Sequence, residues 1–217
     1  MRSIALTLLV LAAAPLGAQS VDGTIDRAVA AWDKIKTVRG TFEQTVTNSL
    51  TGSSAVARGK YVQQRPNRLA IRFTQPATDA IVSDGKYIWV YLPSSAPGQV
   101  VKRPAERGST PIDLTGQFLD EPRAKYDIVA AGTRTVDGHA THGLTLTPKK
   151  GVNAPFTRAT VWVDDDDALI REFEETEPTG VTRHVKLTSV EPNVEVDRQT
   201  FEFAIPSGAR IVDQTKP

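Results

Sequence analysis

The sequence of 217 residues contains no cysteine. Disulfide bonds are therefore excluded, and so are metal sites or nucleophiles built from thiolates. An acylated N-terminal cysteine, the anchor of bacterial lipoproteins, is not expected either. The folded state must depend on the burial of apolar side chains, for which about 200 residues suffice.

The short motifs of common enzyme sites are also missing. There is no G-x-S-x-G, no His-Glu-x-x-His and no glycine-rich phosphate loop. His139, His142 and His184 have no paired carboxylates or cysteines beside them in sequence, so we expect structural or surface roles. The four acidic residues 164–167 lack the glycine and terminal glutamate of a calcium loop and are interpreted as a hairpin tip. We expect no enzymatic activity, no metal and no cofactor.

Charge of one sign does not predominate. Lys and Arg number 26 and Asp and Glu 25, and the balance is even once Arg2 is set aside. A protein with this balance has no general attraction to nucleic acid or to anionic head groups. A nucleic-acid partner is therefore not expected.

The N-terminus has the pattern of an export signal. Arg2 is followed by an apolar run at residues 4–14, which is shorter than the roughly 20 residues that span a bilayer. Small residues follow, and we expect cleavage after Ala18, with Ser20 as a second candidate position. The sequence thus predicts a signal peptide at residues 1–18 and one domain at residues 19–217, located in the periplasm.

A helix is predicted after the signal, and strands follow it. Thr24 is the expected N-cap of a helix that runs to about Lys36, with apolar residues spaced for one buried stripe. From Arg39 the apolar period changes to two, which is typical of strands. Turn residues then recur at the intervals of antiparallel barrels or sandwiches. Later strands are predicted at residues 126–130, 133–136, 143–147, 157–163, 169–176, 182–190 and 201–205.

The segment 93–125 differs from the rest because five prolines interrupt it. Thr110 and Pro111 form an expected helix start, with proline at the first helical position. A short amphipathic helix at residues 112–119 follows, including Leu114 and Phe118. A short helix between proline-rich loops is well placed to cover an apolar surface.

The apolar strand faces allow two interpretations. They form either a filled core or the lining of a ligand cavity, and periodicity does not decide between them. Arg65, at a strand end before Pro66, is either a surface arginine or a donor that holds the cover helix by its carbonyl groups or a loop.

Several segments, in order along the chain, resemble the LolA family of periplasmic outer-membrane lipoprotein carriers. These segments are FEQTV at 42–46, RPN at 65–67, TQP at 74–76, SDGKYIWVYLP at 83–93, GLTLTPK at 143–149 and FEFAIPSGARIVDQ at 201–214. The resemblance implies a mainly β fold with a few helices, an unclosed antiparallel β-barrel covered by an α-helical lid.

The resemblance also implies a function and a site. The protein would shield the acyl chains of lipoproteins, receive them from an inner-membrane LolCDE-type transporter and pass them to a LolB-type receptor, acting as a monomer. Arg65 matches the family arginine that links barrel and lid. The hypothesised cavity lining is Phe42, Val46, Leu69, Ile71, Phe73, Trp89, Tyr91, Leu114 and Phe118. The alternative is a periplasmic module on the same scaffold that senses lipid or lipoprotein and regulates a membrane partner.

Overall fold

The computed structural model describes residues 20–105 and 114–215. The expected signal peptide at 1–18 and the expected helix start at Thr110 and Pro111 lie outside these residues, as do the first two residues of the expected cover helix. The helices are α1 (Val21–Asp33), α2 (Gly116–Leu119), α3 (Pro122–Lys125) and the 3-10 helix η1 (Arg198–Phe201). The strands are β1 (Thr37–Asn48), β2 (Ser54–Gln64), β3 (Arg68–Gln75), β4 (Ala77–Asp84), β5 (Tyr87–Tyr91), β6 (Gln99–Pro104), β7 (Tyr126–Val136), β8 (His139–Pro148), β9 (Arg158–Asp164), β10 (Ile170–Thr176), β11 (Val181–Pro192) and β12 (Arg210–Asp213).

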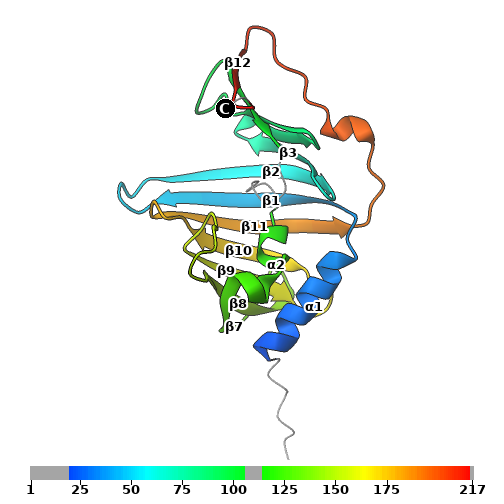
Figure 1. Cartoon of the computed structure of the whole chain (residues 1–217), viewed down its shortest axis with the longest axis vertical. Helices are drawn as coiled ribbons and strands as arrows, with labels where there is room; N and C mark the ends of the chain where they lie inside the picture. The colour runs from blue at the N-terminus through cyan, green and yellow to red at the C-terminus, as the bar shows by residue number, and fades with distance from the viewer. Residues whose placement is uncertain (1–19, 106–113, 216–217) are drawn as a thin grey trace, which may run out of the picture.

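All twelve strands belong to one sheet, in the order β12-β6-β5-β4-β3-β2-β1-β11-β10-β9-β8-β7 (Figure 1). Neighbours are antiparallel except β12 and β6, which run parallel. In the described part of the chain β12 and β7 form the two edges, so the sheet is open, as the family resemblance implies. β1 joins two groups of strands, β2–β6 on one side and β7–β11 on the other.

Helix α1 begins earlier than the sequence predicts. The Ser20 hydroxyl accepts a hydrogen bond from the backbone N–H of Gly23 at 3.1 Å, so Ser20 is the N-cap and not Thr24. Thr24 lies inside the helix and is 1% exposed. The predicted stripe is confirmed, since Ile25, Ala28 and Trp32 are buried against the sheet.

The sheet is apolar on both faces over part of its area. We call the face that packs against α1 and α2 the inner face; it carries the main hydrophobic core. The opposite, outer face is covered over β3 and β4 by η1 and the segment around it, where Phe201 is buried against Ala70 and Val82. The strand predicted at residues 201–205 is therefore wrong: the chain forms η1 up to Phe201 and pairs only later, as β12.

Two elements within the proline-rich segment were not predicted. Residues Gln99–Pro104 form β6, which extends the sheet beyond β5. The chain also forms α3 just before β7, with Pro122 at its start. The described part of the predicted cover helix contains α2, which is only four residues long.

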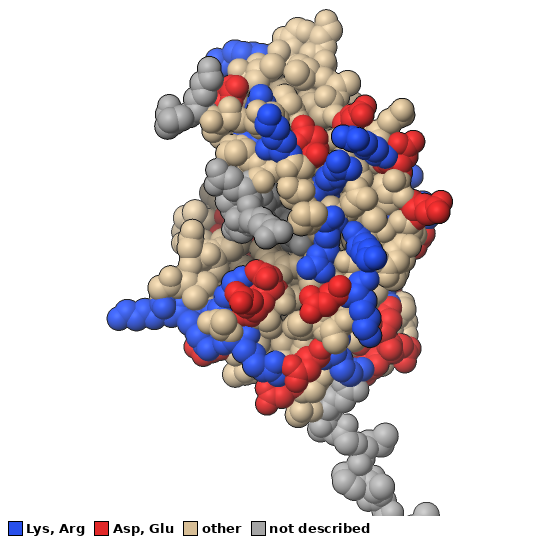
Figure 2. All heavy atoms as spheres, turned by 45° about the vertical axis from the view of Figure 1, so that its right-hand side comes forward, with Lys and Arg blue, Asp and Glu red and all other residues tan. Residues whose placement is uncertain are grey.

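Charges of both signs are interspersed on the surface. Figure 2 shows Lys and Arg side chains among Asp and Glu side chains on one face of the molecule. Cross-strand pairs on β1 are examples: Arg39 lies 2.5 Å from Glu191, and Arg58 lies 3.4 Å from Glu43. Within residues 20–105 and 114–215, no helix is long and apolar enough to cross a bilayer.

Gly40 is required by close packing at the centre of the sheet. A Cβ atom at this position would lie 2.1 Å from the carbonyl oxygen of Ser189 and 2.7 Å from the Tyr61 ring. We expect Gly40→Ala to lower the free energy of unfolding by about 1–3 kcal/mol through overpacking, measured by urea denaturation. Gly52→Ala is the control, because a Cβ there meets no atom within 4 Å and only the left-handed backbone is strained. An equal or smaller loss for Gly40→Ala would contradict the packing argument.

Candidate functional site

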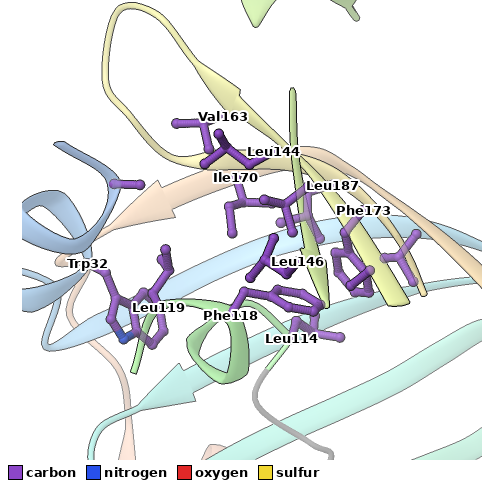
Figure 3. Packing of buried hydrophobic residues seen from close by; sticks show 14 of the residues in the cluster. Trp32, Leu114, Phe118, Leu119, Leu144, Leu146, Val163, Ile170, Phe173 and Leu187 are labelled. Atoms are coloured by element: carbon purple, nitrogen blue, oxygen red, sulfur yellow. The ribbon is translucent and has the colours of Figure 1, made fainter. Parts of the chain in front are cut away.

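The inner face of the sheet is largely apolar where α1 and the segment around α2 cover it. Figure 3 shows Trp32 from α1 and Leu114, Phe118 and Leu119 from the α2 segment beside the sheet residues. The sheet contributes fully buried side chains from β8, β9, β10 and β11, namely Leu144, Leu146, Ala159, Val161, Val163, Phe173 and Val185. This surface is the candidate site because it is apolar, inward-facing and covered by short helical segments.

Phe118 is the main anchor of α2. Its side chain is fully buried, and its ring centroid lies 5.0 Å from that of Phe173 and 5.6 Å from that of Phe156. Aromatic pairs at these distances add to the stabilisation from burial alone. A four-residue helix is too short to be stable by itself, so these contacts hold α2 in place.

Two polar contacts add to this anchoring. The Tyr126 hydroxyl donates to the carbonyl oxygen of Gln117 at 2.9 Å, and the Gln117 amide nitrogen lies 3.3 Å from a Glu175 carboxylate oxygen. Burial, together with the negative charges of Asp120 and Glu175, raises the pKa of Tyr126. The phenol therefore stays protonated at neutral pH and remains a donor.

A cavity remains between the helices and the sheet, next to Trp32 and Leu119. Its volume is about 20 Å³, about enough for one water molecule, and its lining is almost entirely apolar. The lining residues are Ala28, Trp32, Ile35, Val38, Tyr61, Gln63, Leu114, Thr115, Leu119, Ala168, Leu169, Ile170, Leu187 and Val190. In the described part of the chain the helices thus lie against the sheet, and the cavity between them is small.

Arg65 holds the end of α1. Its guanidinium donates to the carbonyl oxygen of Trp32 at 2.9 Å and lies 5.0 Å from the centroid of the Trp32 ring. This carbonyl is in the last turn of α1 and also accepts the backbone N–H of Ile35 at 3.0 Å, so the arginine supplies a second donor to it. The sequence-based hypothesis placed Arg65 against the helix at 112–119; the hydrogen bond described here goes to α1 instead.

Of the nine residues in the hypothesised lining, six lie in the main core. These are Phe42, Leu69, Ile71, Phe73, Leu114 and Phe118, and Phe42 packs edge-on to Phe73 with centroids 5.6 Å apart. Val46 lies on the same side of β1 as Phe42 but is only half-buried and outside this core. Leu114 alone among the nine borders the 20 Å³ cavity.

The placement of Trp89 and Tyr91 is wrong. Both lie on the outer face, where the Trp89 ring stacks on Phe203 with centroids 5.9 Å apart and the Tyr91 ring lies 6.3 Å from it. The inner face of β5 is formed by the alternate residues, as the pairing of Val90 with Ile81 shows, since Ile81 packs against the main core. Both faces of β5 are apolar, so alternation could not identify the inner one.

Most of the residues that line the cavity were not predicted from the sequence. Ile35 lies in the link between α1 and β1, Val38 lies on β1 and Tyr61 on β2. Ala168 and Leu169 lie directly before β10. Their apolar character was visible, but only the sheet register brings them to one place. The helical stripe of α1, which contains Ala28 and Trp32, was the signal that could have found this end of the cavity.

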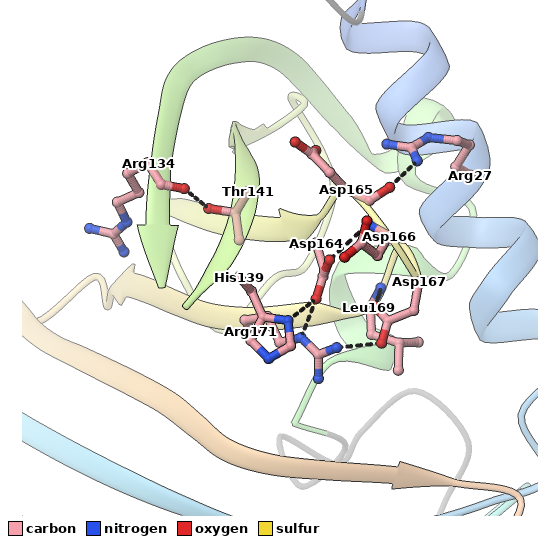
Figure 4. A network of polar contacts seen from close by, with 10 residues as sticks. All are labelled: Arg27, Arg134, His139, Thr141, Asp164, Asp165, Asp166, Asp167, Leu169 and Arg171. Atoms are coloured by element: carbon pink, nitrogen blue, oxygen red, sulfur yellow. Dashed lines mark hydrogen bonds and ion pairs between the residues drawn. The ribbon is translucent and has the colours of Figure 1, made fainter. Parts of the chain in front are cut away.

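The acidic segment 164–167 fastens α1 to the sheet (Figure 4). Asp164 is 1% exposed and lies 2.7 Å from both His139 and Arg171, while Arg27 of α1 donates to the carbonyl oxygen of Asp165 at 2.9 Å. Burial disfavours the Asp164 carboxylate, but hydrogen bonds from the Asp166 backbone N–H and from Arg171 outweigh it and lower its pKa. The hairpin-tip interpretation is confirmed. Among the described residues, no group of three or more His, Cys, Asp or Glu is placed to hold a metal.

His184 and Glu172 form an ion pair on the outer face, 2.5 Å apart. The hydrogen bond to Glu172 raises the pKa of His184 from 6.5. Burial opposes ionisation of Glu172, but His184 and Arg134 lower the pKa of this carboxyl from 4.5. The histidine stabilises the fold below about pH 6.5 and loses this effect as pH rises through its raised pKa; the glutamate loses its effect as pH falls below about 4.5.

From these directions we expect the pair to contribute most between pH 4.5 and 6.5. When the pH is raised from 5.5 to 8, the free energy of unfolding should fall less for His184→Gln than for the unsubstituted protein. The expected difference is at most about 1 kcal/mol, because the histidine is partly exposed. Urea denaturation at the two pH values measures this. Equal losses in both proteins would contradict the expected role of His184.

Comparison with known proteins agrees with this geometry. A family model described as "Outer membrane lipoprotein carrier protein LolA" matches residues 33–204. Outer-membrane lipoprotein carrier proteins of Salmonella paratyphi B and Salmonella typhimurium are 29% identical over 184 residues, which cover 85% of this chain and 85% of theirs. The crystal structure of an uncharacterized conserved protein from Thermus thermophilus has a TM-score of 0.56 at 12% identity, over 89% of this chain and 98% of that one, and shares the fold.

Proposed function

The chain belongs to the LolA family of outer membrane lipoprotein carrier proteins, and on this premise we propose that it is a periplasmic carrier of lipoproteins. It would shield their acyl chains on the inner face of the sheet and move them from the inner to the outer membrane. The observation that carries this proposal is the apolar inner face covered by α1 and by a four-residue helix. Such a short cover can leave the sheet without disrupting it.

The energetics of acyl chains explain why a carrier must hide them. Each CH₂ group transferred from water to an apolar site contributes about 0.8 kcal/mol, so three chains do not leave a membrane for water unaided. Ligand pockets usually measure about 300–1,000 Å³. Since the cavity described here is about 20 Å³, cargo has to displace the α2 segment from the sheet, with or without α1.

Displacement gives the carrier a way to release its cargo. When α2 packs on the inner face, Phe118 occupies the space between Phe156 and Phe173. Closure over the empty site therefore competes with acyl chains for the same apolar surface. The affinity for cargo is the difference between these two free energies, so it stays low enough for transfer.

The proposed partners follow from the family. Acylated lipoproteins are the cargo, a LolCDE-type transporter in the inner membrane supplies them, and a LolB-type receptor in the outer membrane accepts them. Export to the periplasm would depend on the predicted signal peptide at residues 1–18.

The test is release of newly matured lipoprotein from spheroplasts by the purified mature chain. We expect a soluble one-to-one complex with acylated lipoprotein, and no release with buffer or with the chain saturated by fatty acid. If the chain binds fatty acid but leaves the lipoprotein on the membrane, carriage is contradicted and the alternative of a lipid-sensing regulatory module is favoured. If it binds neither, the inner face is a filled core.

A further inference from the structure

One ion pair interrupts the apolar inner face. Arg183 on β11 pairs with Glu175 on β10 in the sheet register, between Val46 on β1 and Ala159 on β9. Glu175 shares a side of β10 with Phe173, whose ring is fully buried in the main core. The pair therefore lies on the same face as the proposed acyl site.

This pair is largely withdrawn from water. The Glu175 side chain is 5% exposed and the Arg183 side chain 17%, and a guanidinium nitrogen lies 2.5 Å from a carboxylate oxygen. The guanidinium also lies 5.3 Å from the centroid of the Phe173 ring. The free energy needed to remove two charges from water offsets much of their mutual attraction. A pair of apolar residues at these positions would therefore stabilise the fold about equally well. A role in binding accounts for its position better than a role in stability.

Gln117 of α2 faces this pair with an open acceptor. Its amide nitrogen lies 3.3 Å from Glu175, which fixes the orientation, because the flipped amide would place two oxygens together. Its side-chain oxygen Oε1 is buried and has no hydrogen-bond partner among the described residues. Buried acceptors are nearly always satisfied, and an open one next to a proposed ligand site needs an N–H donor.

The location relative to the cavity also fits an amphipathic ligand. The 20 Å³ cavity borders Leu187, four residues from Arg183 along β11, or about 13 Å at the rise of a strand. Gln117 belongs to the cover that moves in the proposed mechanism, whereas Glu175 and Arg183 belong to the sheet. When α2 leaves the sheet, the space that opens therefore has Gln117 on one side and Glu175 and Arg183 on the other, with apolar surface next to them.

We propose that Gln117, Glu175 and Arg183 form a polar subsite for the acyl linkages of the cargo, in which Gln117 Oε1 accepts the N–H of the amide that joins an acyl chain to the lipidated N-terminal residue. Arg183 has N–H groups beyond those that face Glu175, and these are donors for the carbonyl oxygens of the linkages. This inference rests on the proposed function. It adds that the site distinguishes an N-acyl amide from other lipids with the same chains.

A matched pair of ligands tests the subsite. The probes are a synthetic triacylated lipopeptide with an N-acyl amide and the same lipopeptide with that amide N-methylated, which replaces the N–H donor by a methyl group. Both are titrated into the full mature chain by displacement of a fluorescent fatty acid. We expect the unsubstituted protein to bind the amide probe about tenfold more tightly than the methylated probe. Gln117→Met should bind the two probes equally, because any change in the docking of α2 alters both affinities alike.

Gln63→Met is the matched control, because Gln63 lines the cavity away from the ion pair. It should keep the tenfold preference. Equal binding of the two probes by the unsubstituted protein, or a preference that persists in Gln117→Met, would overturn the subsite and leave carriage standing. Failure to bind either lipopeptide would overturn the proposed function, and the subsite with it.

Discussion

Arg65→Leu is expected to accept acylated cargo but to transfer it poorly. The substitution removes the hydrogen bond to the Trp32 carbonyl and the contact with the Trp32 ring, which hold the end of α1 in the closed, empty conformation. Hydrogen bonds from charged groups contribute about 1.5–3 kcal/mol, and exposure of Arg65 places this one near the lower end. Because closure over the empty site drives release in the proposed mechanism, we expect transfer to fall about tenfold, the equivalent of about 1.4 kcal/mol.

The measurement is transfer of lipoprotein from the purified complex to outer-membrane vesicles that carry the receptor. Arg68→Leu is the control, because Arg68 contacts Gln64 at 3.2 Å and no residue of α1 in the described hydrogen bonds. It should transfer normally. Arg65→Lys keeps the charge but loses the planar donor, so an intermediate rate is expected. Normal transfer by Arg65→Leu would contradict the assigned role.

Phe118→Ala is expected to strengthen cargo binding while it weakens the fold little. The side chain is fully buried between Phe156 and Phe173, but it belongs to α2 and not to the sheet. A buried Phe→Ala substitution costs roughly 3–5 kcal/mol. If α2 is a cover, most of this loss should weaken the docking of α2 on the sheet and little of it should lower the stability of the sheet itself. The closed state then competes less with cargo, and affinity for a fluorescent fatty acid should rise about tenfold or more.

Phe173→Ala is the matched comparison, because the same ring type is removed from the sheet side of the same contact. We expect it to lower the midpoint of thermal unfolding by about 10 °C, and Phe118→Ala by clearly less. Hydrogen exchange should show α2 opening in Phe118→Ala without loss of protection in β10. Equal thermal destabilisation with no gain in affinity would show that α2 is part of the core and not a cover.

Only part of the strand order can be predicted from the sequence. Strands on either side of tight turns, such as β2 and β3, follow from alternation and turn residues. No turn or other short-range sequence pattern indicates that β1 pairs with β11, although this pairing determines which residues line the cavity. For this reason the hypothesised lining included residues of β1 and β3 but omitted Leu187 and Val190 of β11.

The inner and outer faces of β5 could not be assigned from the sequence, because an unpredicted segment covers the outer face. Trp89 and Tyr91 have the character of core residues, and they are indeed packed, but against Phe203 on the outer face. Prediction of a strand at 201–205 concealed this, since a strand would have extended the sheet and not covered it. The contact of Arg65 was misassigned for a similar reason: both α1 and the α2 segment lie over the inner face, and only coordinates show which carbonyl it reaches.

The central position of β1 has a consequence for how the chain acquires its fold. Strands β2–β6 and β7–β11 are consecutive hairpins that can assemble from neighbouring residues, but β1 and β11 must find each other across most of the chain; Thr41 and Ser189 are 148 residues apart. Contacts of such separation form slowly because the intervening loop must be closed first. After export the two halves of the apolar inner face would thus remain apart and accessible during folding. If the chain is exported as proposed, it would in that interval be exposed to the same lipids that the finished protein is proposed to carry.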